Sequence, residues 1–213
     1  MKIFIAIPCM ESVNTMFFQS ILSLNMGDLG PPKYGVSRSS LVYDARNALA
    51  QTAIDSGADR VMWLDSDMIF EPDIVQRLSA DMDEGRDFVS GLYFTRKNPI
   101  KPVVYKETGY NNDGGDGKVT PYATEFFDYP KDSVFECAGV GFGACMVTTQ
   151  LLKDVYDMYG APFAPVPGFG EDLSFCRKVE EMGVKMYCDS RIKCGHVASI
   201  TVTEDSYLNG LKL

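Results

Sequence analysis

Two aspartates one residue apart, Asp65 and Asp67, follow an apolar segment at residues 61–64. That segment has the length and composition of a strand in a parallel sheet that is covered on both faces. In open sheets of this class, ligands bind beyond the carboxyl ends of the strands. Two carboxylates placed there can present oxygen atoms to one hard divalent cation. The triplet by itself also suits a solvated turn, and its position after a buried strand is what favours a metal site.

A divalent cation at this position could bind both phosphates of a diphosphate and neutralise its charge as that group leaves. The chain needs such a bridge to bind a nucleotide, because 29 acidic against 20 basic residues give a formal net charge of −9. A surface this acidic repels phosphate backbones, so duplex nucleic acid is not expected as a partner.

A second acidic pair, Glu171 and Asp172, lies at the predicted start of a helix over residues 171–182. The helix dipole favours acidic side chains at that end, which is the simpler explanation. The same field tends to keep a carboxylate ionised, and an ionised carboxylate can take a proton from a hydroxyl group. From the residues alone, both interpretations stay open.

Three further features have both a functional and a structural explanation. Arg46 lies on the clearest predicted helix, residues 41–56, and could bind a phosphate or simply be solvated. His196 is the only histidine, and a lone histidine is more often a core or surface residue than a ligand. The six cysteines lack the C-x-x-C spacing of a zinc or redox site, so we expect buried, reduced thiols.

The elements predicted to position these residues alternate between strands and helices. We expect strands over residues 2–7, 34–37, 60–64, 88–94, 134–138, 144–148 and 184–188, and helices over residues 13–24, 41–56, 150–158 and 171–182. Another helix is expected to begin near Pro72 and to end near Met82. Residues 108–121 and 161–170 have the Gly, Asn, Asp and Pro content of loops. The pattern favours one α/β domain with an open, mostly parallel mixed sheet and helices on both faces.

No apolar run reaches the roughly 20 residues that span a bilayer. The short apolar segment at the start of the chain has no cleavage site of a signal peptide, so we interpret it as the first strand. We therefore expect a soluble, cytoplasmic protein with no transmembrane segment.

The order of the motifs resembles that of GT-A-type glycosyltransferases, whose fold is Rossmann-related, and especially bacterial and phage members close to family two. The resemblance covers about residues 1 to 200 and rests on short segments in a specific order. They are Ala45-Arg46-Asn47, residues 57–68 with Asp65-Ser66-Asp67, Gly141-Phe142-Gly143-Ala144, Gly170-Glu171-Asp172 and Gly195-His196.

The resemblance implies roles for these residues. Asp65 and Asp67 would bind Mn²⁺ or Mg²⁺ together with the diphosphate of a UDP- or GDP-sugar, Ser66 between them would contact the donor, and His196 would complete the metal site. The other implied contacts are to the nucleotide base or phosphates for Pro8, Glu11 and Arg46, and to the donor sugar for Gly141 and Gly143. Asp172, in preference to Glu171, would be the general base. Residues 1–105 would form the nucleotide and metal half and residues 106–213 the acceptor half.

Together these features predict a metal-dependent glycosyltransferase that moves a sugar onto a hydroxyl of a carbohydrate or other acceptor. A carboxylate base implies inversion, although some GT-A enzymes with the same order of motifs retain the configuration of the sugar. One alternative is a nucleotidyltransferase, which usually has a glycine-rich, basic loop after the first strand; Pro8-Cys9-Met10-Glu11-Ser12 does not supply one. The other is a binding module without turnover, which we would expect to lack one of the acidic pairs.

Overall fold

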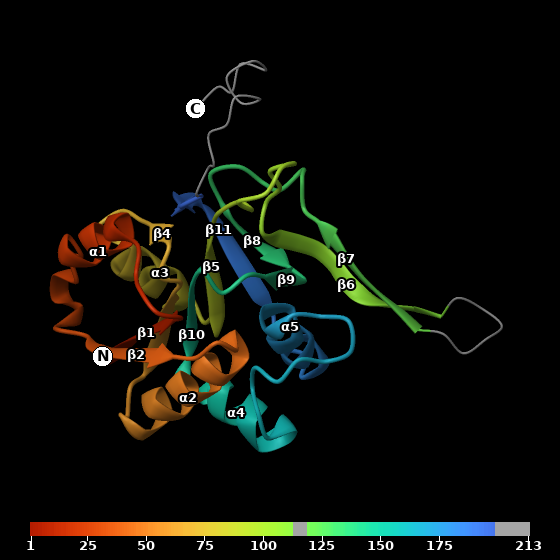
Figure 1. Ribbon diagram of the computed structural model, residues 1–213, viewed down its shortest axis with the longest axis horizontal. Helices are drawn as coiled ribbons and strands as arrows, with labels where there is room; N and C mark the ends of the chain where they lie inside the picture. Colours follow the sequence, from red (N-terminus) through yellow and green to blue (C-terminus); the bar gives the residue numbers. More distant parts are fainter. Residues whose placement is uncertain (113–118, 199–213) are drawn as a thin grey trace, which may run out of the picture.

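A seven-stranded mixed sheet forms the centre of the computed structural model, which describes residues 1–112 and 119–198 (Figure 1). Five strands run in one direction, and two, β10 and β8, run against them. In spatial order the strands are β2 (Lys33–Arg38), β1 (Ile3–Cys9), β3 (Arg60–Leu64), β10 (Ala144–Thr148), β5 (Phe88–Leu92), β11 (Met186–Lys193) and β8 (Val134–Cys137). The predicted open, mostly parallel α/β sheet is confirmed.

Helices cover both faces of this sheet, because the strands bury alternate residues on opposite sides. Ile3, Ile5 and Ile7 of β1 belong to one core cluster, whereas Phe4 and Ala6 belong to the other. The first cluster is closed by α1 (Thr15–Leu22) and α3 (Ile74–Met82), and the second by α2 (Val42–Asp55), α4 (Thr149–Tyr159) and α5 (Glu171–Glu181). Figure 1 shows the two groups of helices on either side of the strands.

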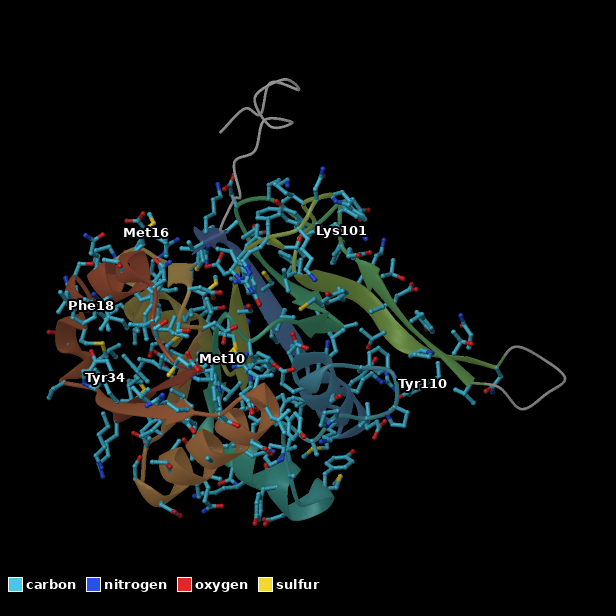
Figure 2. The ribbon with its side chains drawn as sticks, viewed as in Figure 1. Met10, Met16, Phe18, Tyr34, Lys101 and Tyr110 are labelled. Atoms are coloured by element: carbon cyan, nitrogen blue, oxygen red, sulfur yellow. The ribbon has the colours of Figure 1, made fainter. Side chains whose placement is uncertain are left out.

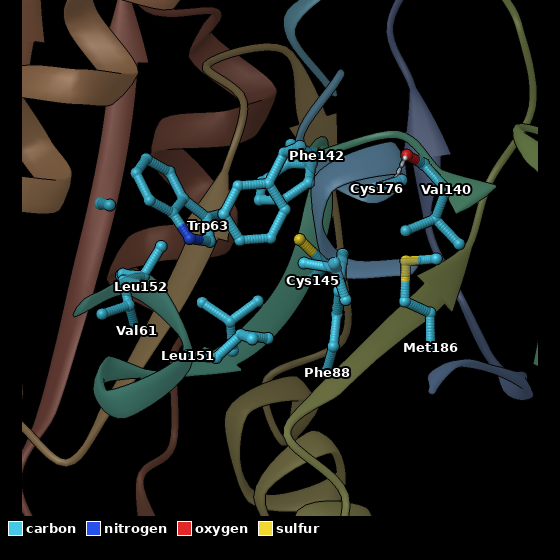
Figure 3. Close-up of a cluster of buried hydrophobic side chains, with 14 of the residues drawn as sticks. Val61, Trp63, Phe88, Val140, Phe142, Cys145, Leu151, Leu152, Cys176 and Met186 are labelled. Carbon is cyan, nitrogen blue, oxygen red and sulfur yellow. Dashed lines mark hydrogen bonds between the residues drawn. The ribbon is translucent and has the colours of Figure 1, made fainter. Parts of the chain in front are cut away.

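Aromatic side chains fill the cluster beneath α2, α4 and α5. Trp63 of β3 is fully buried, and its ring lies 5.9 Å from that of Phe142 between their centroids (Figure 3). The Phe142 ring in turn packs 5.1 Å from Phe175 of α5. This packing fixes α5, which carries the second acidic pair at its start, against the sheet.

Two small sheets flank the large one. In the first, β7 (Val119–Glu125), β6 (Val104–Asn112) and β9 (Gly139–Val140) lie side by side. In the second, β4 (Met68–Ile69) pairs with β12 (Gly195–His196), which brings the end of the described chain next to the segment after β3. A short 3₁₀ turn, η1 (Gly27–Leu29), completes the elements, and no helix in the described ranges is long and apolar enough to cross a membrane.

The prediction of a loop over residues 108–121 is wrong. Most of this segment forms the β6–β7 hairpin, and its residues 113–118 lie outside the described residues. The hairpin packs on the rest of the fold: the Tyr110 ring lies 5.4 Å from that of Phe169, and the Tyr110 hydroxyl donates to the Pro167 carbonyl at 2.9 Å. These distant contacts outweigh the local turn propensity of Gly, Asn and Asp.

The helix predicted to start near Pro72 is present, and its first helical residue is Ile74. The carbonyl of Pro72 accepts a hydrogen bond from the Asn25 backbone N–H at 2.8 Å and stays outside the helical ladder, so that α3 begins at Ile74. The end of α2 is as expected: Gly57 has a φ of +66°, a left-handed conformation that glycine adopts without strain. All six cysteines are free, and five of them are buried, which confirms the expectation for the thiols.

Candidate active site

A pocket of about 530 Å³ opens at the carboxyl ends of β1 and β3. It receives side chains from α2, from the start of α5, from the end of β12, and from the segments that follow β3 and β5. Residues predicted from the sequence that line it are Pro8, Arg46, Asp65, Ser66, Asp67, Glu171, Asp172 and His196. These polar side chains therefore meet at the carboxyl ends of the strands, which is where ligands bind in open α/β sheets.

Arg46 lies at the floor of this pocket and links the two acidic pairs. Its side chain is 2 % exposed. Its Nη2 lies 2.9 Å from Oδ1 of Asp65, and its Nε lies 3.2 Å from Oε1 of Glu171. Burial lowers the pKa of Arg46, but the charges of Asp65 and Glu171 more than offset this and raise it. The guanidinium is therefore a fixed cation between two carboxylates.

This placement corrects the view of Arg46 as a solvated helix residue. Its flat guanidinium lies against the Trp63 and Phe142 rings, with the Cζ atom 5.8 and 5.5 Å from their centroids. Nη1 is buried and has no hydrogen-bond partner among the described residues. Because Nη2 and Nε already bind protein carboxylates, contact with a phosphate stays a prediction.

Arg46→Met is expected to lower the free energy of unfolding by on the order of 3–5 kcal/mol, because it leaves two carboxylates without their buried counter-charge. Urea unfolding at neutral pH measures this. Lys185→Met is the control, since Lys185 pairs with Glu136 on the surface at 2.7 Å and should matter little. A loss below about 1 kcal/mol for Arg46→Met would mean that the ion pairs do not hold the site together.

Asp65 and Asp67 differ in their surroundings although both reach the pocket. The Asp65 side chain is 30 % exposed, and its backbone N–H donates to the Gly143 carbonyl at 3.0 Å. Burial raises the pKa of Asp65, against the opposing charge of Arg46. Burial acts on Asp67 as well, but the neighbouring His196 ring and the charge of Arg96 lower the pKa of Asp67 below its usual value. Asp67 is the more firmly ionised of the two.

His196 faces Asp67 with the nitrogen that can bind a metal. Its Nδ1 lies 3.0 Å from the Phe94 carbonyl oxygen, so a neutral ring donates from Nδ1 and leaves a lone pair on Nε2. That Nε2 lies 3.6 Å from Oδ1 of Asp67. Two acceptors at this distance need a proton or a cation between them, and imidazole with carboxylate is a donor set that suits Mn²⁺. The chemistry of these side chains fits a divalent metal ion.

As arranged, however, the side chains are not yet a closed metal site. In the described ranges, no three side chains of His, Cys, Asp or Glu are close enough together to hold a metal ion. The second oxygen of Asp67, Oδ2, lies 2.5 Å from Nη1 of Arg96. Oδ2 of Asp67 can therefore take part in metal binding only if Arg96 gives up this contact.

Asp172 and Glu171 are distinguished by their partners. Glu171 is engaged by Arg46, whereas the one hydrogen bond that Asp172 Oδ1 accepts from the described residues comes from the neighbouring Leu173 backbone N–H, at 2.7 Å. Burial, reinforced by the charge of Glu171, raises the pKa of Asp172 to about 6. A carboxylate of this kind is ionised at neutral pH and still basic enough to accept a proton.

The remaining predicted site residues lie outside the pocket. Gly141 and Gly143 sit behind Tyr93, which covers them: a Cβ on Gly141 would lie 2.0 Å from the Tyr93 hydroxyl oxygen, and the Gly143 N–H donates to that oxygen at 3.1 Å. Glu11 lines an adjoining hollow that shares Ser66, Asp67 and the exposed Met10, labelled in Figure 2, with the pocket.

Sequence reasoning missed four residues that line the pocket after β5. They are Tyr93, Thr95, Arg96 and Lys97. The rule that located Asp65 applies here too, because Tyr93 lies at the carboxyl end of the predicted strand over residues 88–94 and the other three residues follow that end.

The comparisons with known proteins bear on the fold. No protein-family model and no curated protein sequence matches the chain. Among solved structures, A197 from STIV is 20% identical with a TM-score of 0.65, covering 93% of this chain and 87% of that one. GalNAc-T7, crystallised with UDP, GalNAc and Mn²⁺, is 13% identical with a TM-score of 0.62, covering 93% and 44%. S. aureus TarS 1–349 is 16% identical with a TM-score of 0.57, covering 92% and 60%.

The chain has a GT-A-like fold. GalNAc-T7 and TarS are GT-A glycosyltransferases, and the predicted fold class is thereby confirmed. The GT-A-like chain spans less than half of the GalNAc-T7 chain and three fifths of the TarS chain. At identities this low the likeness shows the fold alone, so membership of family two stays a prediction.

Proposed function

We propose that this chain is a metal-dependent glycosyltransferase that moves a sugar from a nucleotide-diphosphate sugar to an acceptor hydroxyl. The observation that carries the proposal is the meeting of two acidic pairs and the only histidine around one pocket at the sheet end. The likeness of the fold to GT-A glycosyltransferases supports the same reaction class.

In this proposal Asp65, Asp67 and His196 hold Mn²⁺ or Mg²⁺, with the nucleotide base near Pro8 at the end of β1. Bound there, the ion would neutralise charge on the diphosphate as it leaves. Arg46 orients the Asp65 carboxylate through the 2.9 Å contact and cannot move away, because aromatic rings enclose it. GalNAc-T7 was crystallised with UDP and Mn²⁺, which makes this pair the first choice of probe.

Asp172 is the proposed general base. It would take the proton from the acceptor hydroxyl as the oxygen attacks the sugar carbon and the bond from that carbon to the diphosphate breaks. Glu171 is less suited to this role because its carboxylate is bound by Arg46. Direct attack by an acceptor activated in this way inverts the configuration of the sugar.

A shift in melting temperature tests the binding part of the proposal. UDP and GDP are each added with Mn²⁺, and again with EDTA. Metal-dependent stabilisation by either nucleotide is expected, because a ligand that binds only the folded state raises its stability. Stabilisation that EDTA leaves unchanged, or none with either nucleotide, would contradict the proposed site.

His196→Ala is expected to weaken Mn²⁺ binding about tenfold or more while changing the melting temperature little, because His196 is a proposed ligand near the pocket surface. Calorimetric titration with MnCl₂ and a melting curve are measured side by side. A marked fall in melting temperature with unchanged Mn²⁺ affinity would assign His196 a purely structural role.

A further inference from the structure

The segment between β5 and β6 carries cationic side chains and is held at both ends by hydrogen bonds. The Thr95 N–H donates to the Lys101 carbonyl at 2.9 Å, and the Lys101 N–H donates to Thr95 Oγ1 at 3.1 Å. Lys101, which Figure 2 labels, also pairs with Glu125 of β7 at 2.6 Å. Arg96 and Lys97 stand between these two anchor points and line the pocket. The two ends of the segment are therefore held in place, while Arg96 and Lys97 line the pocket.

Arg96 is bound differently from Arg46, the other arginine of the pocket. Arg46 is 2 % exposed and engages two carboxylates, whereas the Arg96 side chain is 50 % exposed. Within the described part of the chain, its one ion pair is the contact of Nη1 with Oδ2 of Asp67. An exposed pair of this kind contributes little stability and exchanges readily for another partner.

When a diphosphate binds, its negative charges need positively charged partners, because the pocket is acidic. Four carboxylates line it, from Asp65, Asp67, Glu171 and Asp172. A divalent ion balances only two of them, and the charge of Arg46 is already shared between Asp65 and Glu171. The negative charges of a diphosphate would therefore meet excess negative potential unless Arg96 and Lys97 faced them. A guanidinium binds phosphate oxygens with two parallel donors, which makes Arg96 the better suited of the two.

We propose that Arg96 is a diphosphate-binding residue that leaves Asp67 when a divalent cation binds there and pairs with the phosphates instead. The proposal rests on the proposed function. Arg96 serves as the counter-charge of Asp67 in the metal-free protein and as the counter-charge of the diphosphate in the loaded one. It follows that Arg96 opposes binding of the metal alone and favours binding of the diphosphate.

Arg96→Gln tests this because the two effects have opposite signs. Titration with MnCl₂ alone is expected to show a few-fold tighter binding than in the parent, since no ion pair at Asp67 has to be broken. Titration with UDP and with GDP at saturating Mn²⁺ is expected to show binding about tenfold weaker or more, since a charge-assisted contact is lost. Arg96→Lys keeps the positive charge but loses the two parallel donors of the guanidinium. Its affinities for Mn²⁺ and for the diphosphate should therefore lie between those of the parent and of Arg96→Gln.

Lys185→Gln is the control for the loss of one positive charge, because Lys185 pairs with Glu136 at the opposite edge of the sheet. It should change neither affinity. Unchanged diphosphate affinity in Arg96→Gln overturns the proposal, and so does weaker binding of both Mn²⁺ and diphosphate, which would make Arg96 a residue that only orders Asp67. A parent protein that binds neither UDP nor GDP with Mn²⁺ contradicts the proposed function itself, and this proposal with it.

Discussion

Asp67→Ala is expected to abolish Mn²⁺-dependent binding of UDP or GDP while the fold stays intact. Asp67 is the more firmly ionised of the two aspartates and the one that faces Nε2 of His196. Loss of a residue that merely orients a metal ligand costs about 10–100-fold in affinity, so loss of the ligand should cost more than about a hundredfold. Calorimetric titration of the variant with each nucleotide, with and without Mn²⁺, measures the effect.

The fold should tolerate this change because the side-chain partners of Asp67 are the exposed Arg96 and the partly exposed His196. Asp28→Ala, in η1 and outside the pocket, is the control for the loss of one carboxylate. An Asp67→Ala variant that binds either nucleotide with the affinity and metal dependence of the parent would show that the metal is held elsewhere.

Asp172→Asn is expected to lower the rate of transfer by about a hundredfold or more and to leave donor and metal affinity nearly unchanged. A base that acts only while the hydroxyl attacks contributes to the transition state and little to binding of the donor. Measuring the single-turnover rate of transfer and the donor affinity of the same variant separates an effect on the transition state from an effect on donor binding. Glu171→Gln is the comparison, because the larger loss of rate at equal donor affinity identifies the base. Transfer at the parent rate by Asp172→Asn would remove Asp172 from the mechanism.

The same residue gives the expected pH dependence. With the pKa of Asp172 raised to about 6, transfer should fall as the pH drops below about 6 and the carboxylate gains a proton. The folded protein binds this proton more readily than the unfolded chain, so Asp172 destabilises the fold as the pH rises from about 4 to above 6. Asp172→Asn should therefore be more stable than the parent at pH 8 and equal to it near pH 4, as measured by urea unfolding.

Local patterns in the sequence were enough to place much of the metal half of the site. The apolar run of β3 has the predicted bounds, Arg60–Leu64, and the rule that ligands bind at strand ends then locates Asp65 and Asp67. The helix that begins at Glu171 follows in the same way from its buried stripe and its acidic start. In each case the information lies within a few consecutive residues.

What could not be predicted depends on contacts between distant segments. The sequence of α2 does not indicate that Arg46 meets Glu171, because that contact exists only once α5 packs on Phe142. The β6–β7 hairpin is stabilised by Phe169, far along the chain, against the turn propensity of its own residues. The strand-end rule points to Arg96, but its pairing with Asp67 could not be predicted, because the two residues follow different strands.

The most direct test of the proposed glycosyl transfer is the product released from a panel of UDP- and GDP-sugars with Mn²⁺ and a mixture of carbohydrate acceptors. We expect at least one donor to release its nucleoside diphosphate, with release abolished by EDTA and by Asp67→Ala. This product follows because the bond that breaks joins the sugar carbon to the diphosphate. Release of a nucleoside monophosphate would indicate cleavage between the phosphates, and consumption of no donor in the presence of Mn²⁺ would indicate a binding module; either result would contradict glycosyl transfer.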